Sequence, residues 1–212
     1  MFDNPYVDAN SAKNIVGQSE FVKLGHLSQR RSIVLLKNLI IDNDNFLPLS
    51  GRPKIYIENI NNIVANNYCQ VVSTPEAADY AILRLAALWQ PPRNDANMLE
   101  SFFHQGDLDF KGEEKERLLK VAETVPTIID IYLDHPAVIP QITQRCAGLL
   151  ANYGASDEAV LDIIFGQFLP EGKLPFELPS SMIAVENQLE DVPYDSENPL
   201  FPYGFGLTYE DN

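Results

Sequence analysis

The sequence predicts an α/β domain of the three-layer sandwich class, in which helices cover both faces of a mostly parallel sheet of five or six strands. The first observation is a series of short apolar runs that suit strands buried on both faces. The second is that segments with helical periodicity alternate with these runs, as in chains whose parallel strands are joined by crossover helices. The chain has 212 residues, of which 45% are hydrophobic, and this is enough for one such domain with a substantial core.

Each predicted strand is a short apolar run that is bounded by polar or turn-forming residues. Short apolar runs of this kind fit strands that are buried on both faces. In chain order, the predicted strands are Lys54–Glu58, Cys69–Val72, Tyr80–Leu85, Thr127–Leu133 and Ala147–Asn152.

The predicted helices lie before and between these runs, where apolar residues recur at helical spacing. The last helix is the best defined, because Ser156 can cap its first turn and Gly166 can end it with a positive φ. Residues 1–19 are expected to form an entry segment with one short helical turn, and residues 38–52 a loop. The predicted helices are Glu20–Lys37, residues 59–67, Glu113–Glu123, Ala137–Arg145 and the segment that follows Ser156.

A long connection at residues 86–111 interrupts this alternation. It leaves the carboxyl end of the predicted strand Tyr80–Leu85 and contains paired prolines and two aromatic clusters. Ligands of parallel sheets gather at the carboxyl ends of strands, and loops of this length in a compact domain are usually functional. We therefore expect the functional residues of this chain to lie in or beside this connection.

Composition excludes several classes of function. The formal net charge of −15 argues against binding to nucleic acid or to an anionic membrane surface, because both require a basic surface. No run approaches the roughly 20 apolar residues that span a bilayer, and the first residues do not resemble a signal peptide. Cys69 and Cys146 are predicted to be buried free thiols, and the three histidines lack metal-ligand spacing, so we expect neither a metal nor a cofactor.

Several motifs, taken in order, resemble glycoside hydrolase family 3, the family of β-glucosidases and β-xylosidases. The resemblance runs along nearly the whole chain and is strongest near the start of the domain and in the last third. The motifs are Phe2–Val7, Arg31–Asn38 with Leu47–Leu49 after it, Ile164–Leu178 and Pro199–Tyr209.

The resemblance implies that this chain is the second domain of such an enzyme, an α/β sandwich that follows a catalytic barrel. It implies a linker from the barrel at residues 1–19, the sandwich domain at residues 20–179, and a C-terminal tail that packs on the domain at residues 180–212. In the family, the barrel supplies the nucleophilic Asp in a Ser-Asp-Trp-like motif, together with a Lys-His pair. Neither motif occurs in this sequence, where the single tryptophan, Trp89, follows Leu88. The isolated chain is therefore expected to be inactive.

The resemblance also directs attention to a proton donor. Retaining glycosidases use two carboxyl groups about 5 Å apart, one as nucleophile and one as acid/base. In many relatives the second domain sends a Glu into the barrel's site from a loop after the third strand, but here the stretch Leu85–Trp89 contains no carboxylate. Glu100 is the first candidate for the acid/base and Asp107 the second, and the alternative for Glu100 is a solvated loop residue.

Other side chains near the connection are candidates for contacts with a sugar. Trp89 can stack on a pyranose ring or belong to the core or a domain interface. Arg93 and Arg84 can bind hydroxyl groups or pair with structural carboxylates. His104 can donate to a sugar hydroxyl or satisfy backbone groups in its loop.

A second group of candidates ends the strand Thr127–Leu133. Asp134 and His135 occupy the place where many relatives have a short Gly-Arg-Pro turn that faces the active site. The alternative is a turn in which Asp134 caps the next helix.

Three functions remain open at this level. The first is the second domain of a β-glucosidase-like enzyme that hydrolyses O-glycosidic bonds at non-reducing ends, with the barrel and a carbohydrate substrate as its partners. The second is a carbohydrate-binding or protein-interaction module that has kept the fold without the chemistry. The third, an unrelated flavodoxin-like regulator, rests on fold analogy alone.

Overall fold

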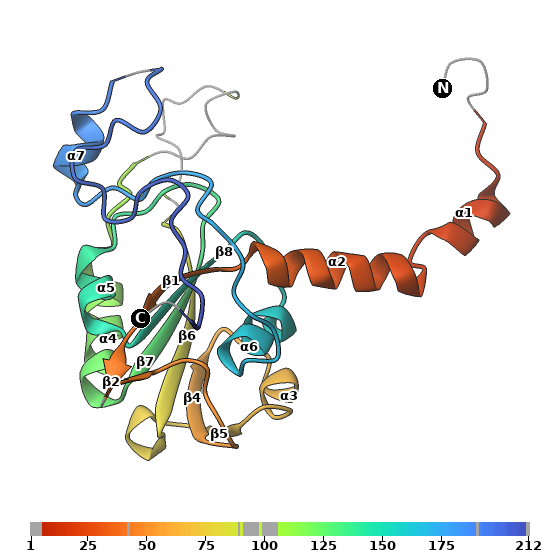
Figure 1. Cartoon of the computed structure of the whole chain (residues 1–212), viewed down its shortest axis with the longest axis horizontal. Helices are drawn as coiled ribbons and strands as arrows, with labels where there is room; N and C mark the ends of the chain where they lie inside the picture. The colour runs from red at the N-terminus through yellow and green to blue at the C-terminus, as the bar shows by residue number, and fades with distance from the viewer. Residues whose placement is uncertain are drawn as a thin grey trace.

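The computed structural model describes residues 6–41, 43–88, 90, 98, 106–189 and 191–210. Its centre is a six-stranded sheet in the order β1-β8-β7-β6-β4-β5. Strands β4 to β8 in this sheet are parallel, and β1 pairs with β8 in the antiparallel direction. Helices lie on both sides of the sheet (Figure 1), which confirms the predicted three-layer α/β class.

The predicted strands are confirmed with small shifts at their ends. A two-stranded ribbon, β2 with β3, lies outside the main sheet and within the segment expected to be a loop. The strands are β1 (Val34–Asn38), β2 (Ile40–Ile41), β3 (Asp44–Asn45), β4 (Lys54–Glu58), β5 (Gln70–Val72), β6 (Tyr80–Ala86), β7 (Thr127–Tyr132) and β8 (Gly148–Asn152).

The helices form two layers and an arm. Helices α4 and α5 cover one face of the sheet and α3 and α6 the other, while α1 and α2 extend away from the domain (Figure 1). A short 3-10 helix, η1 (Pro75–Ala77), precedes β6. The α-helices are α1 (Ala9–Ile15), α2 (Ser19–Ser32), α3 (Asn62–Ala65), α4 (Gly112–Thr124), α5 (Pro140–Arg145), α6 (Asp157–Ile164) and α7 (Met182–Glu186).

Two hydrophobic cores, one on each face, explain why the strands are apolar throughout. Successive residues of a strand point to opposite faces, and the side chains of β6 follow this rule. Ala81, Leu83 and Leu85 enter the core under α4 and α5, and Ile82 enters the core under α3 and α6. Cys146 lies in the first core and Cys69 in the second, where both are buried free thiols as predicted.

The predicted helix Glu20–Lys37 is wrong only beyond Ser32. Helix α2 ends at Ser32, and Val34–Asn38 is the sixth strand, β1. Val34 and Leu35 are fully buried beside β8, whereas Leu24 in α2 is 62% exposed. The apolar residues of α2 and β1 thus fall into one helical period by chance. Pairing with β8 gives residues 34–38 their strand conformation.

Other helices differ from expectation mainly at their ends. Ser156 caps α6, since its hydroxyl accepts from the Ala159 N–H at 3.3 Å, and Gly166 follows the helix with φ +69, as predicted. Helix α3 is shorter than residues 59–67. Helix α5 begins at Pro140 and not at Ala137.

The C-terminal tail covers the edge of the sheet beside β1. The Leu207 N–H donates to the Leu35 carbonyl at 2.8 Å, and the Gly172 N–H donates to the Ile33 carbonyl at 3.2 Å. A Cβ at Gly172 would lie 2.4 Å from the Ile33 carbonyl oxygen. Because Gly172 has no side chain, its turn can approach the start of β1 closely. The turn thereby covers an edge strand that would otherwise expose unpaired backbone groups.

We predict that Gly172→Ala lowers the free energy of unfolding by about 1–3 kcal/mol, because the new methyl group collides with rigid backbone. Chemical denaturation of the purified chain measures this change. Gly25→Ala is the matched control, because a Cβ at Gly25 meets nothing within 4 Å. Equal stability of the two variants would contradict the close approach.

Candidate functional site

The order of the strands places a topological switch point at the carboxyl ends of β4 and β6. From β4 the chain moves outward to β5, and from β6 it moves in the opposite direction to β7 and β8. Ligands of open parallel sheets bind where the chain changes direction in this way. The connection at residues 86–111 leaves from this same edge.

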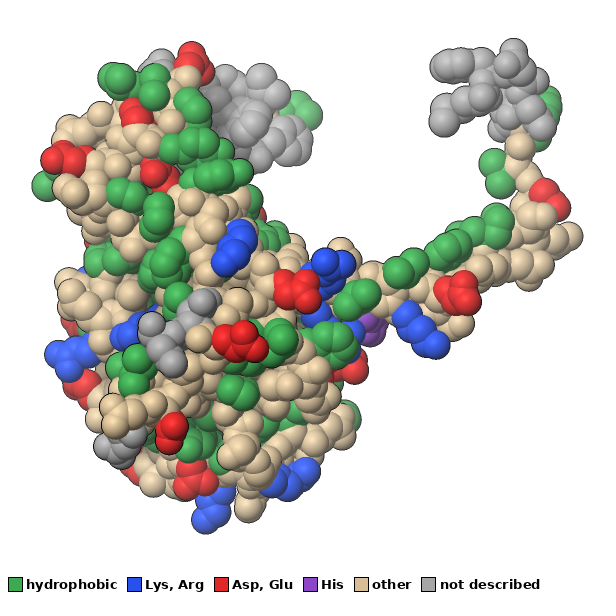
Figure 2. All heavy atoms as spheres, viewed as in Figure 1, with side chains coloured by type: hydrophobic (Ala, Val, Ile, Leu, Met, Phe, Trp, Pro, Cys, Tyr) green, Lys and Arg blue, Asp and Glu red, His purple; other side chains and the backbone are tan. Residues whose placement is uncertain are grey.

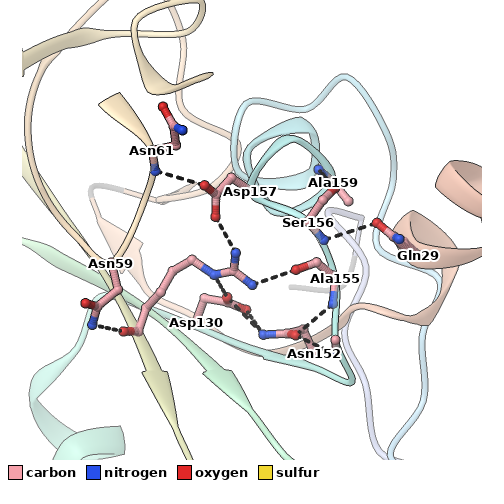
Figure 3. A network of polar contacts seen from close by, with 11 residues as sticks. Gln29, Asn59, Asn61, Asp130, Asn152, Ala155, Ser156, Asp157 and Ala159 are labelled. Carbon is pink, nitrogen blue, oxygen red and sulfur yellow. Dashed lines mark hydrogen bonds and ion pairs between the residues drawn. The ribbon is translucent and has the colours of Figure 1, made fainter. Parts of the chain in front are cut away.

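A buried ion-pair network lies at this edge of the sheet (Figure 3). Arg84 on β6 donates from Nε to Asp130 on β7 at 2.8 Å and from Nη2 to the Ala155 carbonyl at 2.8 Å. Its Nη1 pairs with Asp157, the first residue of α6. The Arg84 side chain is 16% exposed and the Asp130 side chain is fully buried. Arg84 thus pairs with structural carboxylates, which was one of its two predicted roles.

Asparagines extend this network to the adjoining strands and loops. The Asn152 side-chain amide at the end of β8 donates to both carboxylate oxygens of Asp130 at 3.0 Å. The Asn59 side chain, just after β4, donates to the Arg84 carbonyl at 2.8 Å, and the Asn61 N–H donates to Asp157 at 2.8 Å. The network therefore joins the carboxyl ends of β4, β6, β7 and β8.

Burial and pairing act in opposite directions on the charges of this network. Burial raises the pKa of Asp130, while the Arg84 guanidinium and the Asn152 amide oppose that rise. Burial also lowers the pKa of Arg84, but the two carboxylates outweigh this effect and raise it overall. The ion pair depends on both members, because either charge left alone in this position is costly.

Asp107, the second acid/base candidate, lies just before α4 and is already paired. The Lys111 ammonium contacts one of its carboxylate oxygens, and the Asp109 N–H donates to the other at 3.1 Å. The hydrogen bond from Lys111 holds the pKa of Asp107 below its usual value. A carboxylate that is stabilised in its ionised form is a poor proton donor, so this geometry disfavours Asp107 as the acid.

The Asp134–His135 turn follows β7 at the same edge. The His135 Nδ1 lies 2.8 Å from Asp134 Oδ1, and the two side chains are 14% and 32% exposed. The alternative in which Asp134 caps the next helix is wrong, because Ile139 occupies the N-cap of α5 and residues 137–139 are not helical. The carboxylate is paired with the imidazole instead.

Backbone pairing brings these two groups of candidates together. The Val138 N–H donates to the Leu108 carbonyl at 2.9 Å, and Asp109 forms an isolated parallel bridge with Val138. The segment that carries Asp107 therefore runs beside the segment that follows His135. The other candidates, Trp89, Arg93, Glu100 and His104, lie outside the described residues and stay predictions.

A pocket of about 320 Å³ adjoins this edge and was not predicted from the sequence. Pro136 and Leu108 line one part of it, and the rest is lined by the end of the sandwich domain, including Phe176 and Glu177, and by the tail. The Glu177 carboxylate is buried and accepts from the Ser196 N–H at 2.7 Å and from the Gln188 side chain at 3.3 Å. The available sequence signal was a single charged residue, Glu177, within an apolar run bounded by Pro175 and Pro179, which indicates a buried carboxylate that needs hydrogen-bond partners.

Two classes of site have no support among the described residues. No group of three His, Cys, Asp or Glu side chains there is arranged to hold a metal ion. In the same part of the chain, every helix is too short or too polar to cross a bilayer.

A family model for the glycosyl hydrolase family 3 C-terminal domain matches residues 54–209. The chain belongs to glycoside hydrolase family 3. The match includes the sheet from β4 onward, the candidate edge and the tail. Residues 9–32, which form helices α1 and α2, lie before it.

Relatives within family 3 match the chain over its whole length. Beta-glucosidase C of Emericella nidulans is 50% identical over 218 residues, which cover 100% of this chain and 34% of that protein. A periplasmic beta-glucosidase/beta-xylosidase of Dickeya chrysanthemi is 36% identical over 216 residues, covering 99% of this chain and 32% of that protein. The chain thus spans about a third of the length of these relatives.

Solved structures share the fold. A β-glucosidase from Erythrobacter marinus matches with a TM-score of 0.74 and 19% identity, over 98% of this chain and 38% of that one. A beta-glucosidase from Listeria innocua, solved in complex with glucose, matches with a TM-score of 0.73 and 18% identity, over 98% and 36% of the two chains. At this identity the likeness bears on the architecture alone.

We predict that Arg84→Met lowers the free energy of unfolding by about 3–5 kcal/mol, because it leaves the Asp130 carboxylate buried without its cation. Burial then keeps the folded-state pKa of Asp130 above its unfolded value, so the folded variant binds the proton more tightly. The deficit relative to the unsubstituted chain should therefore be largest near pH 8 and shrink toward about pH 5.

Denaturant unfolding of both proteins at several pH values measures this dependence. The matched control is Arg145→Met, because the Arg145–Glu123 pair spans 3.7 Å and both side chains are more than half exposed. We expect that control to change stability by less than about 1 kcal/mol. A deficit for Arg84→Met that is equally small, or that does not change with pH, would contradict the role assigned to the network.

Proposed function

We propose that this chain is the C-terminal domain of a β-glucosidase-like enzyme and that it forms part of the wall of an active site whose nucleophile lies on another domain. The supporting observation is the 50% identity, along the whole chain, with a third of Beta-glucosidase C. On this proposal, the substrate is a β-glucoside or a related glycoside with its non-reducing end in the site, and the other domain is the barrel that the family resemblance implies.

The described carboxylates support an incomplete site. Asp107 is paired with Lys111, Asp134 with His135, and the buried Glu177 with the Ser196 N–H. A retaining mechanism requires two carboxyl groups that face the substrate together, one of them as nucleophile. None of these three carboxylates forms such a pair with another. Asp130 is committed to Arg84. The nucleophile is therefore assigned to the rest of the enzyme.

The proton donor is assigned to the connection that leaves β6. With Asp107 held ionised by Lys111, Glu100 is the candidate for the acid/base. A general acid must keep its proton near neutral pH, and a loop that closes against an apolar surface provides the burial that raises the pKa of a carboxyl group. Trp89, Arg93 and His104 on the same connection are proposed to contact the substrate.

Asp134 and His135 are proposed to bind sugar hydroxyl groups from the neighbouring strand end. Their hydrogen bond orients the imidazole against the Asp134 carboxylate, whose side chain is 32% exposed at the edge of the sheet, whereas the His135 Nε2 atom is buried. The Asp134 carboxylate can accept from a sugar hydroxyl group, and the imidazole holds the carboxylate in position. The buried network beneath them holds the ends of β6 and β7 in a fixed position.

We predict that the isolated chain does not hydrolyse nitrophenyl β-glucosides, and that activity returns when the chain is joined to a catalytic domain. A suitable chimera is Beta-glucosidase C of Emericella nidulans with its matching third replaced by this chain, since the two are 50% identical there. The assay compares the chain, the chimera and the intact fungal enzyme. Turnover by the purified chain alone, or a folded chimera without activity, would contradict the proposal.

The same chimera identifies the proton donor. We predict that Glu100→Gln reduces kcat/KM by about 10²–10⁴-fold for substrates with poor leaving groups and much less for activated nitrophenyl substrates, because only poor leaving groups need protonation. Asp107→Asn is the matched control, with a small effect on both substrate classes. A loss confined to poor leaving groups in Asp107→Asn, with Glu100→Gln unaffected, would reverse the assignment.

A further inference from the structure

The arm formed by α1 and α2 carries apolar side chains that this domain does not cover. Figure 1 shows both helices extending away from the sheet, and neither helix contains a buried residue. On α2, Phe21 is 54% and Leu24 is 62% exposed, and Ile15 and Val16 at the end of α1 are 54% and 79% exposed. In Figure 2 hydrophobic side chains form a row along one edge of the arm.

Helix α2 binds its own domain through polar side chains. Arg30 pairs with Asp162 at 2.5 Å and with Glu158 at 3.7 Å, both on α6, and the side chains of Arg30 and Asp162 are only 12% and 3% exposed. The Gln29 side chain accepts from the Ser156 N–H at 3.1 Å, at the start of the same helix. The partly buried ion pair fixes the C-terminal half of α2 against α6.

The apolar side of α2 faces away from these contacts. Residues of an α-helix are rotated by about 100° each, so Phe21 and Arg30, nine positions apart, lie on opposite sides of α2. A surface helix normally turns its apolar side toward its own core and its charged side toward solvent. Helix α2 does the reverse, which is the arrangement of a helix that lies between two bodies.

The comparisons indicate which body covers this side. The family model for the C-terminal domain begins at residue 54, after the arm. The similarity to Beta-glucosidase C nevertheless spans 100% of the chain, arm included, although only 34% of that protein is matched. The arm is thus shared with the longer enzymes and precedes the residues that the C-terminal-domain model matches.

We infer that Phe21, Leu24, Ile15 and Val16 form a docking surface for the catalytic part of the same enzyme polypeptide. This inference rests on the proposed function, because it names the surface through which the two domains meet. The occupant presents a complementary apolar surface to the arm, and the Arg30–Asp162 pair sets the angle at which the arm leaves this domain. Contacts of this kind keep the sheet edge that bears the proposed acid/base in register with the nucleophile.

Hydrogen exchange of residues 19–28, followed by mass spectrometry, tests the docking surface in the isolated chain and in the chimera described above. We expect exchange in the chimera to be at least about tenfold slower, because docking buries the helix and suppresses its opening. The double variant Phe21→Glu/Leu24→Glu should abolish this protection and lower the thermal midpoint of the chimera. It should leave unfolding of the isolated chain unchanged.

Ile63→Glu is the matched control, because Ile63 on α3 is 80% exposed and lies outside the arm. It should leave the protection and the thermal midpoint of the chimera unchanged. Equal exchange of residues 19–28 in the two proteins would overturn the inference. So would a concentration-dependent dimer of the isolated chain, seen by light scattering and dissociated by the double variant, because a second copy would then be the occupant.

Exchange and catalysis separate this inference from the proposed function. A protected arm in an inactive chimera upholds the docking surface and contradicts the catalytic role. An active chimera whose arm exchanges as fast as in the isolated chain upholds the catalytic role and overturns the docking surface.

Discussion

The buried pairing of Arg84 with Asp130 and Asp157 fixes the geometry on which the rest of this domain depends. Three adjoining parallel strands end in this network, with β4 joined to it through Asn59. Removing either partner would leave an uncompensated charge in the interior, which is costly. The intact pair itself adds little net stability, and its main effect is to fix how the strands and α6 meet. Strands β6 and β7, which lead to the connection at residues 86–111 and to the Asp134–His135 turn, both end at the edge that this network holds.

The carboxyl edge of the sheet, which the Arg84 network holds, suits a domain that contributes residues to an active site whose nucleophile lies on another domain. Three described carboxylates near this edge, Asp107, Asp134 and Glu177, are paired with Lys111, with His135 and with the Ser196 N–H, all groups of this same chain. The arm adds a second sign of incompleteness, because α2 binds its domain with charges and presents phenylalanine and leucine outward. Both features are explained by a partner domain of the same enzyme.

The sequence predicts the sheet well because burial on both faces leaves a strong local signal. Thr127–Tyr132 and Tyr80–Ala86 are apolar runs, and the single charge within each, Asp130 and Arg84, is the residue that needs a partner across the sheet. The start of the domain was predicted less well. Apolar residues of α2 and β1 continue one helical period, and only the antiparallel contact with β8 distinguishes a strand there.

Prediction of the site from sequence was limited by contacts between distant segments. The bond from the Ser196 N–H to Glu177 joins the tail to the end of the sandwich domain, and no shared motif links the two residues. The pairing of Val138 with Leu108 places the Asp134 turn beside Asp107 without a local signal. The pairing of Asp107 with Lys111 differs, because its i,i+4 spacing is visible in the sequence.

Trapping the covalent intermediate of the chimera shows directly which domain carries the nucleophile. A 2-deoxy-2-fluoro-β-glucoside with a dinitrophenyl leaving group glycosylates the nucleophilic carboxylate and releases dinitrophenolate, and the resulting glycosyl ester persists long enough for peptide mapping by mass spectrometry. We expect the added mass to lie on a carboxylate outside these 212 residues. A label on any Asp or Glu of this chain would contradict it.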